Sequence, residues 1–74
     1  MQLNYDAVKN DGQYHTMATV GEYTIKGYAG EFGNISLNVF ASGKNLCSSY
    51  SLRHVENFIE SFDLAGWLKK EATI

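Results

Sequence analysis

Side chains that bind metals or act as nucleophiles are few in this chain. His15, His54 and Cys47 are its soft metal ligands, and no two of them lie at a recognised zinc spacing. Cys47 or Ser51 could pair with His54 as a nucleophile and its base. Catalysis would also need an orienting carboxylate and a pocket, for which 74 residues leave little room. The sequence therefore predicts no metal site and no enzyme.

Glycine loops that hold phosphate groups are not recognised either. Gly27, Gly30 and Gly33 follow a GxxGxxG spacing, which matches neither the dinucleotide fingerprint nor the phosphate loop. Because they separate predicted strands, they are better interpreted as turn glycines. Gly43-Lys44 resembles the end of a phosphate loop, but the earlier glycine and the magnesium-binding hydroxyl are missing from the required positions. No cofactor is predicted.

The charges of the chain do not favour nucleic acid as a ligand. The net charge is −2, and the six basic residues are scattered, apart from the neighbours Lys69 and Lys70. Tyr28 and Phe40 beside Lys26 could still stack on bases, so a nucleic-acid-binding protein is kept as the least favoured alternative.

An acidic stripe is expected near the C-terminus. Glu56, Glu60 and Asp63 follow the i, i+4, i+7 spacing of one helical face. Such a stripe could dock against a basic groove of a partner, or it could be an ordinary solvated face.

The length of the chain allows a single domain over residues 1–74 with one small core. A core of this size barely offsets the conformational entropy lost on folding. Cys47, the single cysteine, cannot form an internal disulfide, so a partner or a second copy is the expected source of extra stability. No secretory signal or membrane span is recognised, which together with the unpaired thiol indicates a cytoplasmic protein.

Glycines and a twofold alternation of apolar and polar residues predict an antiparallel sheet in the first two thirds of the chain. The expected strands cover residues 3–8, 14–20, 23–28, 35–39 and 46–48. Asn10-Asp11-Gly12 is a strong turn signal and predicts a hairpin between the first two strands. Residues 30–34 and 41–45 are expected to turn the chain again.

The hydrophobic period then changes from two to 3.6, which predicts an amphipathic helix. Its apolar stripe is Leu52, Val55, Phe58, Ile59 and Phe62. Ser51 is well placed as its N-cap, with Ser49 as the competing cap. At Asp63 the helix either breaks, with Asp63 capping a second short turn, or runs on to Lys70. The predicted fold is α+β, an antiparallel β-meander of three to five strands with a C-terminal amphipathic helix packed on one face.

One helix can cover only one face of such a sheet. We assign Val20, Ile25, Ile35, Leu37 and Val39 to the covered face. The opposite face then presents Thr24, Lys26, Tyr28, Ser36, Asn38 and Phe40. The chain has five tyrosines, which are favoured at interfaces, although some of these rings could instead fill gaps in a thin core.

The order of strands, turns and helix, the length, the acidic balance and the absence of catalytic motifs resemble small phage-encoded inhibitors of host defence of the anti-CRISPR type. The resemblance implies an inhibitor in the host cytoplasm that blocks a larger host complex, such as a CRISPR effector, by occupying a surface. We therefore expect a non-catalytic protein-binding module, with a homodimeric structural or accessory protein as the alternative. The candidate partner-binding residues are Lys26, Tyr28, Asn38, Phe40, Glu56, Glu60 and Asp63.

Overall fold

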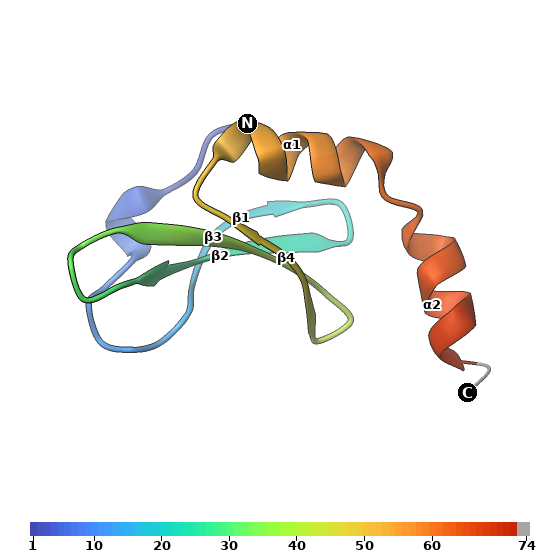
Figure 1. The fold of residues 1–74 in the computed structure, drawn as a ribbon, viewed down its shortest axis with the longest axis horizontal. Helices are drawn as coiled ribbons and strands as arrows, with labels where there is room; N and C mark the ends of the chain where they lie inside the picture. The colour runs from blue at the N-terminus through green and yellow to red at the C-terminus, as the bar shows by residue number, and fades with distance from the viewer. Residues whose placement is uncertain (73–74) are drawn as a thin grey trace.

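The computed structural model describes residues 1–72 as an antiparallel sheet followed by two helices (Figure 1). The elements in chain order are the 3-10 turn η1 (Tyr5–Ala7), strands β1 (His15–Val20), β2 (Tyr23–Ala29), β3 (Ile35–Ala41) and β4 (Lys44–Ser49), and helices α1 (Leu52–Ser61) and α2 (Leu64–Ala72). The strands lie in the order β1-β2-β3-β4, and each neighbouring pair is antiparallel. The predicted α+β fold, a meander followed by a helix packed on the sheet, is confirmed.

Strands β2 and β3, which their alternation predicted as strands, form the centre of the sheet. Ile25 from β2 and Leu37 and Val39 from β3 are at most 1% exposed. Val20 and Ile35 pack half-buried at the margin of the same face. The five residues assigned to the covered face therefore do face the core.

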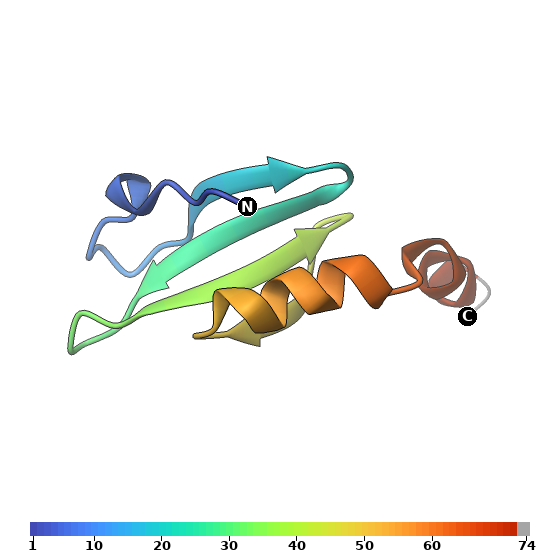
Figure 2. The ribbon, with the colours of Figure 1, turned by 90° about the horizontal axis from the view of Figure 1, so that it is seen from above.

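Residues 3–8 do not form the predicted first strand. Tyr5–Ala7 makes one 3-10 turn, and the segment runs alongside β1 on the same side of the sheet as α1 (Figure 2). Backbone hydrogen bonds close the turn, from the Ala7 N–H to the Asn4 carbonyl at 3.3 Å and from the Val8 N–H to the Tyr5 carbonyl at 3.2 Å. A hydrogen bond from the Asn4 backbone N–H to the Met17 carbonyl, at 3.1 Å, joins it to β1. The predicted hairpin between residues 3–8 and 14–20 is therefore wrong.

Gly27 lies within β2, so its interpretation as a turn glycine is wrong. The N-terminal segment fits onto the sheet at this residue. A Cβ atom on Gly27 would lie 2.5 Å from Met17 Sδ and 2.6 Å from Val8 Cγ2. Only a residue without a side chain allows this close approach. Leu3 and Val8 in this way reach the core without belonging to a strand.

The turn between β3 and β4 is shorter than predicted. It consists of Ser42 and Gly43 alone, with φ angles of 52° and 75°. Two left-handed residues in a row are the type I′ geometry that suits the twist of a hairpin. Ala41 and Lys44 consequently pair with each other, and β4 begins at Lys44 rather than at residue 46.

Helix α1 lies across β3 and β4 and covers one face of the sheet (Figures 1 and 2). Its stripe places Val55 in the core with no exposed surface, and burial of a valine of this kind stabilises the fold by about 1.5–3 kcal/mol. The Ser51 hydroxyl oxygen accepts a hydrogen bond from the His54 backbone N–H at 3.3 Å, so Ser51 is the N-cap as predicted.

The helical region breaks at Asp63, which decides between the two alternatives left open by the sequence. α1 ends at Ser61, Phe62 has an extended backbone, and the Asp63 carboxylate accepts a hydrogen bond from the Gly66 N–H at 3.0 Å. The second helix, α2, then projects past the end of the sheet (Figure 1). Leu64 anchors it in the core. Neither described helix is long and apolar enough to cross a membrane.

Candidate functional site

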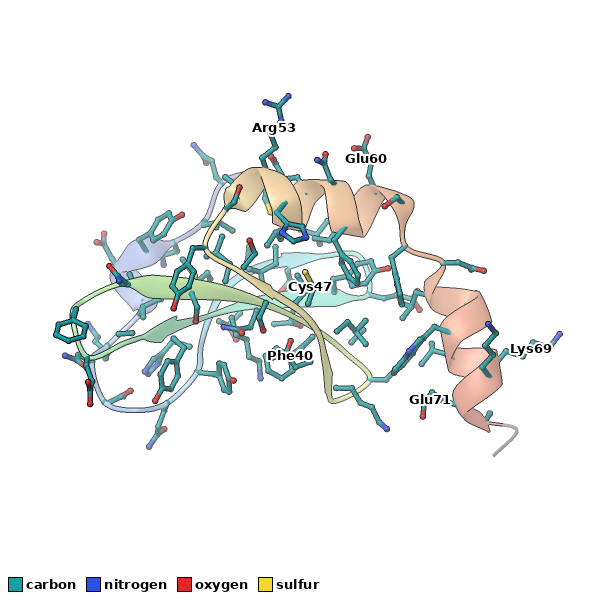
Figure 3. The ribbon with its side chains drawn as sticks, viewed as in Figure 1. Phe40, Cys47, Arg53, Glu60, Lys69 and Glu71 are labelled. Carbon is teal, nitrogen blue, oxygen red and sulfur yellow. The ribbon has the colours of Figure 1, made fainter. Side chains whose placement is uncertain are left out.

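Among residues 1–72, no helix covers the face of the sheet opposite α1, and we call it the bare face. The strand register arranges its side chains in rows: Thr24 lies opposite Phe40, Lys26 opposite Asn38, and Tyr28 opposite Ser36. The rows continue onto the outer strands at Thr16, Thr19, Asn45 and Ser48. Figure 3 shows Phe40 on this face, and Arg53 and Glu60 on the far side of the molecule. The predicted outward residues of β2 and β3 therefore do share one surface.

Three aromatic rings gather on the bare face. The Tyr14 ring contacts the Tyr28 ring at 5.4 Å between centroids and the Phe40 ring at 5.2 Å, in tilted and edge-on orientations. Ring pairs of this geometry stabilise each other by about 0.5–1.5 kcal/mol beyond the area they bury. Tyr14 is 48% exposed and Tyr28 is 36% exposed. The aromatic cluster, Tyr14, Tyr28 and Phe40, is thus ordered by its own contacts while facing solvent.

Lys26 lies beside one of these rings. Its Nζ atom lies 4.8 Å from the centroid of the Phe40 ring, within range of a cation–π interaction. Within residues 1–72, no carboxylate forms an ion pair with Lys26. Phe40 of the aromatic cluster therefore contacts a cation that has no carboxylate partner among these residues.

Asn38 lies beneath the surface of the bare face at 4% exposure. Its Nδ2 donates to the Lys26 and Ser36 carbonyl oxygens, at 3.2 and 3.3 Å, and its Oδ1 accepts from the Ser48 hydroxyl at 2.7 Å. A further, longer bond of 3.4 Å comes from Asn45 Nδ2. Asn38 is therefore a positioning residue that ties β2, β3 and β4 together, rather than an exposed contact residue.

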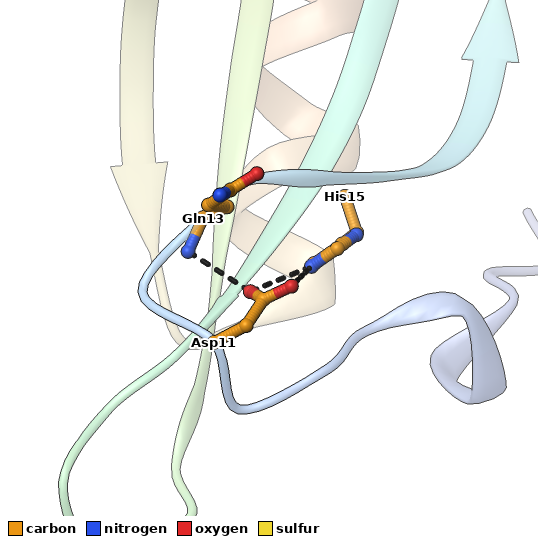
Figure 4. Close-up of polar contacts among 3 residues, drawn as sticks. All are labelled: Asp11, Gln13 and His15. Atoms are coloured by element: carbon orange, nitrogen blue, oxygen red, sulfur yellow. Dashed lines mark hydrogen bonds and ion pairs between the residues drawn. The ribbon is translucent and has the colours of Figure 1, made fainter.

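The position of Tyr14 is fixed by the segment that leads into β1 (Figure 4). His15 Nε2 lies 2.8 and 2.9 Å from the two Asp11 carboxylate oxygens, and the Gln13 backbone N–H donates to Asp11 Oδ1 at 3.0 Å. The His15 hydrogen bond is the main cause that lowers the pKa of Asp11 below its ordinary value. Tyr14 lies within this hydrogen-bonded loop, and the Tyr14 ring lies on the bare face.

An open hollow of about 230 Å³ adjoins the aromatic cluster. Lys26 and Phe40 form its wall, and Glu22, Thr24, Ala41, Ser42 and Gly43 complete the lining. A second hollow, of about 420 Å³, is lined by Asn34, Ile35 and Tyr50. Only the first borders the aromatic cluster.

The acidic candidates lie away from the bare face. Glu56 Oε2 lies 3.2 Å from the N-terminal amino group, and Asp63 caps α2. Because α1 ends at Ser61, the stripe predicted to join Glu56, Glu60 and Asp63 along one helix is interrupted. The structure therefore separates the seven predicted residues into Lys26, Tyr28 and Phe40 on the bare face, Asn38 beneath it, and three acids on the helical side.

Tyr14 is the member of the aromatic cluster that the sequence analysis did not select. Tyr14 could have been selected from the alternation of the predicted strand 14–20, because Tyr14 and Thr16 share a face and Met17, on the other face, is buried. The contact with Phe40, two strands away, required knowledge of the fold.

The residues considered for catalysis are not assembled into a nucleophilic site. Burial raises the pKa of the Cys47 thiol, the opposite of the lowering that activates a cysteine. The Ser51 hydroxyl is engaged as the helix cap, and the His54 side chain is exposed. Within the described residues, no three histidine, cysteine or acidic side chains lie close enough together to hold a metal ion.

Comparison of the chain with protein-family models, curated proteins and solved structures gave no match.

Proposed function

We propose that this protein is a non-catalytic module that binds a protein partner through its bare face. The observation that carries the proposal is the aromatic cluster of Tyr14, Tyr28 and Phe40, which is held in ring contact on the side of the sheet without a helix. Tyrosine and phenylalanine are enriched in the centres of protein interfaces, where they supply large contact areas.

The cluster has little conformational freedom left to lose on binding. Tyr28 and Phe40 project from the two central strands, and the hydrogen bonds of Asn38 hold these strands and β4 in register. Ordering side chains at an interface costs about 0.5–1.5 kcal/mol for each mobile one. A surface ordered before binding avoids much of this cost, which favours recognition by contact.

Nucleic acid is a weaker explanation for the same surface. A platform for stacking bases presents free ring faces beside several cations. Here Tyr14 contacts both other rings, and Lys26 is the single charged side chain that the strands place on the bare face.

The resemblance to anti-CRISPR inhibitors extends the proposal to an inhibitor that acts in the cytoplasm by occupying a surface of a larger complex.

The test is capture of partners from a nuclease-treated lysate of the source cells, using the wild-type chain and a Tyr28→Ala/Phe40→Ala double variant. We expect the wild type to retain a protein specifically and the double variant to lose at least about 90% of it, because hot-spot aromatic residues each contribute roughly 2 kcal/mol or more. Circular dichroism checks that the variant is folded.

The matched control is Tyr5→Ala. Tyr5 is exposed to the same extent as Tyr14, at 48%, but lies in η1 on the α1 side of the sheet. Capture should survive this change. If the double variant retains every partner of the wild type, binding through the bare face is disproved.

A further inference from the structure

We infer that the partner presents an aspartate or glutamate side chain to Lys26 at the centre of the bare face. This inference rests on the proposed function and names the chemistry of the surface that the bare face recognises. It follows from the distribution of charge between the sheet and the rest of the chain.

The four strands contain no carboxylate, although the chain has eight. The strands contain two lysines, and they differ in their surroundings. Lys44 Nζ pairs with Glu71 of α2 at 3.6 Å, so its charge is compensated within the molecule. Among residues 1–72, the one interaction of the Lys26 ammonium group is with the Phe40 ring. In a chain with a net charge of −2, the strands therefore place a single charge on the bare face, and it is positive.

The surroundings of Lys26 make a carboxylate a favourable addition. Lys26 is half-buried, so part of its hydration is already lost, and a charge pair in such a place is stronger than one in open water. Glu22 lines the same hollow but does not form an ion pair with Lys26. A side chain entering the hollow can lay its methylene groups on the Phe40 ring and place its carboxylate beside Lys26 Nζ.

A second copy of the chain does not meet this requirement. A symmetric pairing of two bare faces would bring Lys26 toward its own copy, and the strands supply no carboxylate to separate the two charges.

The first step of the test finds what lies on the bare face. The photoreactive residue p-benzoylphenylalanine replaces Thr16, which lies opposite Lys26 at the exposed margin of the face. After irradiation in the lysate, mass spectrometry identifies the cross-linked molecule. We expect a peptide from another protein that contains Asp or Glu. A cross-link to a second copy of this chain or to nucleic acid overturns the inference.

The second step tests the charge. Lys26→Glu should reduce capture of that protein by at least about tenfold, Lys26→Met should reduce it less, and Lys26→Arg should retain it. Lys69→Glu on α2 changes the net charge equally at a site away from the bare face, and should have no effect. Changing the partner's cross-linked Asp or Glu to Lys should restore its capture by Lys26→Glu.

The two proposals fail in different ways. If Lys26→Glu captures the protein as well as the wild type does, while Tyr28→Ala/Phe40→Ala does not, the acidic contact is disproved and binding through the bare face stands. If the double aromatic variant also captures it fully, the proposed function fails as well.

Discussion

At the scale of single residues, Asn38 shows how a side chain on an outward position can still be structural. The strand period correctly placed it on the bare face, but its neighbours on three strands enclose it and satisfy its amide. Sequence alternation gives the direction of a side chain, whereas its burial depends on which residues the register places around it.

Asn38→Ala is expected to lower the free energy of unfolding by about 1–3 kcal/mol, because it removes the hydrogen bonds that join β2, β3 and β4. Urea denaturation measures the change. Ser36→Ala, which removes a more exposed hydroxyl from the same network, is the control and should cost less. An equal or smaller loss for Asn38→Ala would show that the network does not stabilise the sheet.

The Asp11–His15 pair gives a prediction about pH. Since the folded protein lowers the pKa of Asp11, the pair stabilises the fold above the ordinary aspartate value of about 3.9, and this contribution is lost as the pH falls through the lower folded value. His15→Ala should return the Asp11 pKa toward the ordinary value, as measured by NMR titration of the carboxyl carbon. His54→Ala should leave it unchanged. No shift in His15→Ala would contradict the assigned cause.

Little of this residue-level detail was predictable. Asp11, Gly12 and His15 were recognisable only as a turn signal and an isolated histidine, because the pairing depends on the left-handed Gly12, whose φ is 72°, turning the chain back on itself. Lys26, Tyr28 and Phe40 were predictable because they lie on regular strands.

At the scale of elements, the β3–β4 hairpin depends on a serine in an unfavourable conformation. Ser42 has a φ of 52°, which residues other than glycine and asparagine rarely adopt. Asparagine followed by glycine is the preferred pair for this turn. Residues 41–45 were predicted as a longer turn because serine is not typical of a left-handed backbone conformation.

Ser42→Asn is therefore expected to raise the free energy of unfolding by about 0.5 kcal/mol, and Gly43→Ala to lower it by about 1 kcal/mol. Urea denaturation of the two variants distinguishes the effects. Stabilisation by Gly43→Ala would contradict the turn geometry. Ser42 lines the hollow beside Phe40, so the asparagine variant also reports whether the hollow tolerates a larger side chain.

Helix α1 and the strands β2 and β3 were the elements that the sequence predicted best. The change of period at Leu52 and the Ser51 cap located the start of α1, and the core face of β2 and β3 followed from alternation. The N-terminal segment was mistaken for a strand because Leu3 and Val8 are apolar. Val8 packs on the sheet at Gly27 instead, and Leu3 packs against the margin of the core.

At the scale of the whole molecule, α2 is the part least tied to the core. Leu64 is the one buried residue of α2 among those described. Trp67 of α2 contacts Phe62, with 6.4 Å between the two ring centroids. The ion pair between Lys44 and Glu71 joins two exposed side chains and is worth at most about 1 kcal/mol.

We expect the α2 amides to exchange with deuterium much faster than those of β2 and β3, because α2 can open without unfolding the sheet. Hydrogen exchange followed by NMR measures this residue by residue, with the α1 amides near Val55 as the protected reference. Equal exchange rates in α2 and in the central strands would show that the two helices and the sheet unfold together.

The two edges of the sheet are unequal, and this limits how copies could join. The N-terminal segment lies along β1 and bonds to it through Asn4, while β4 forms the opposite edge. If two copies paired through β4, the continuous sheet would end on both sides in β1, where the hydrogen bond from Asn4 already occupies the Met17 carbonyl. Each outer edge of such a pair would be partly engaged by its own chain, which disfavours further growth through β1.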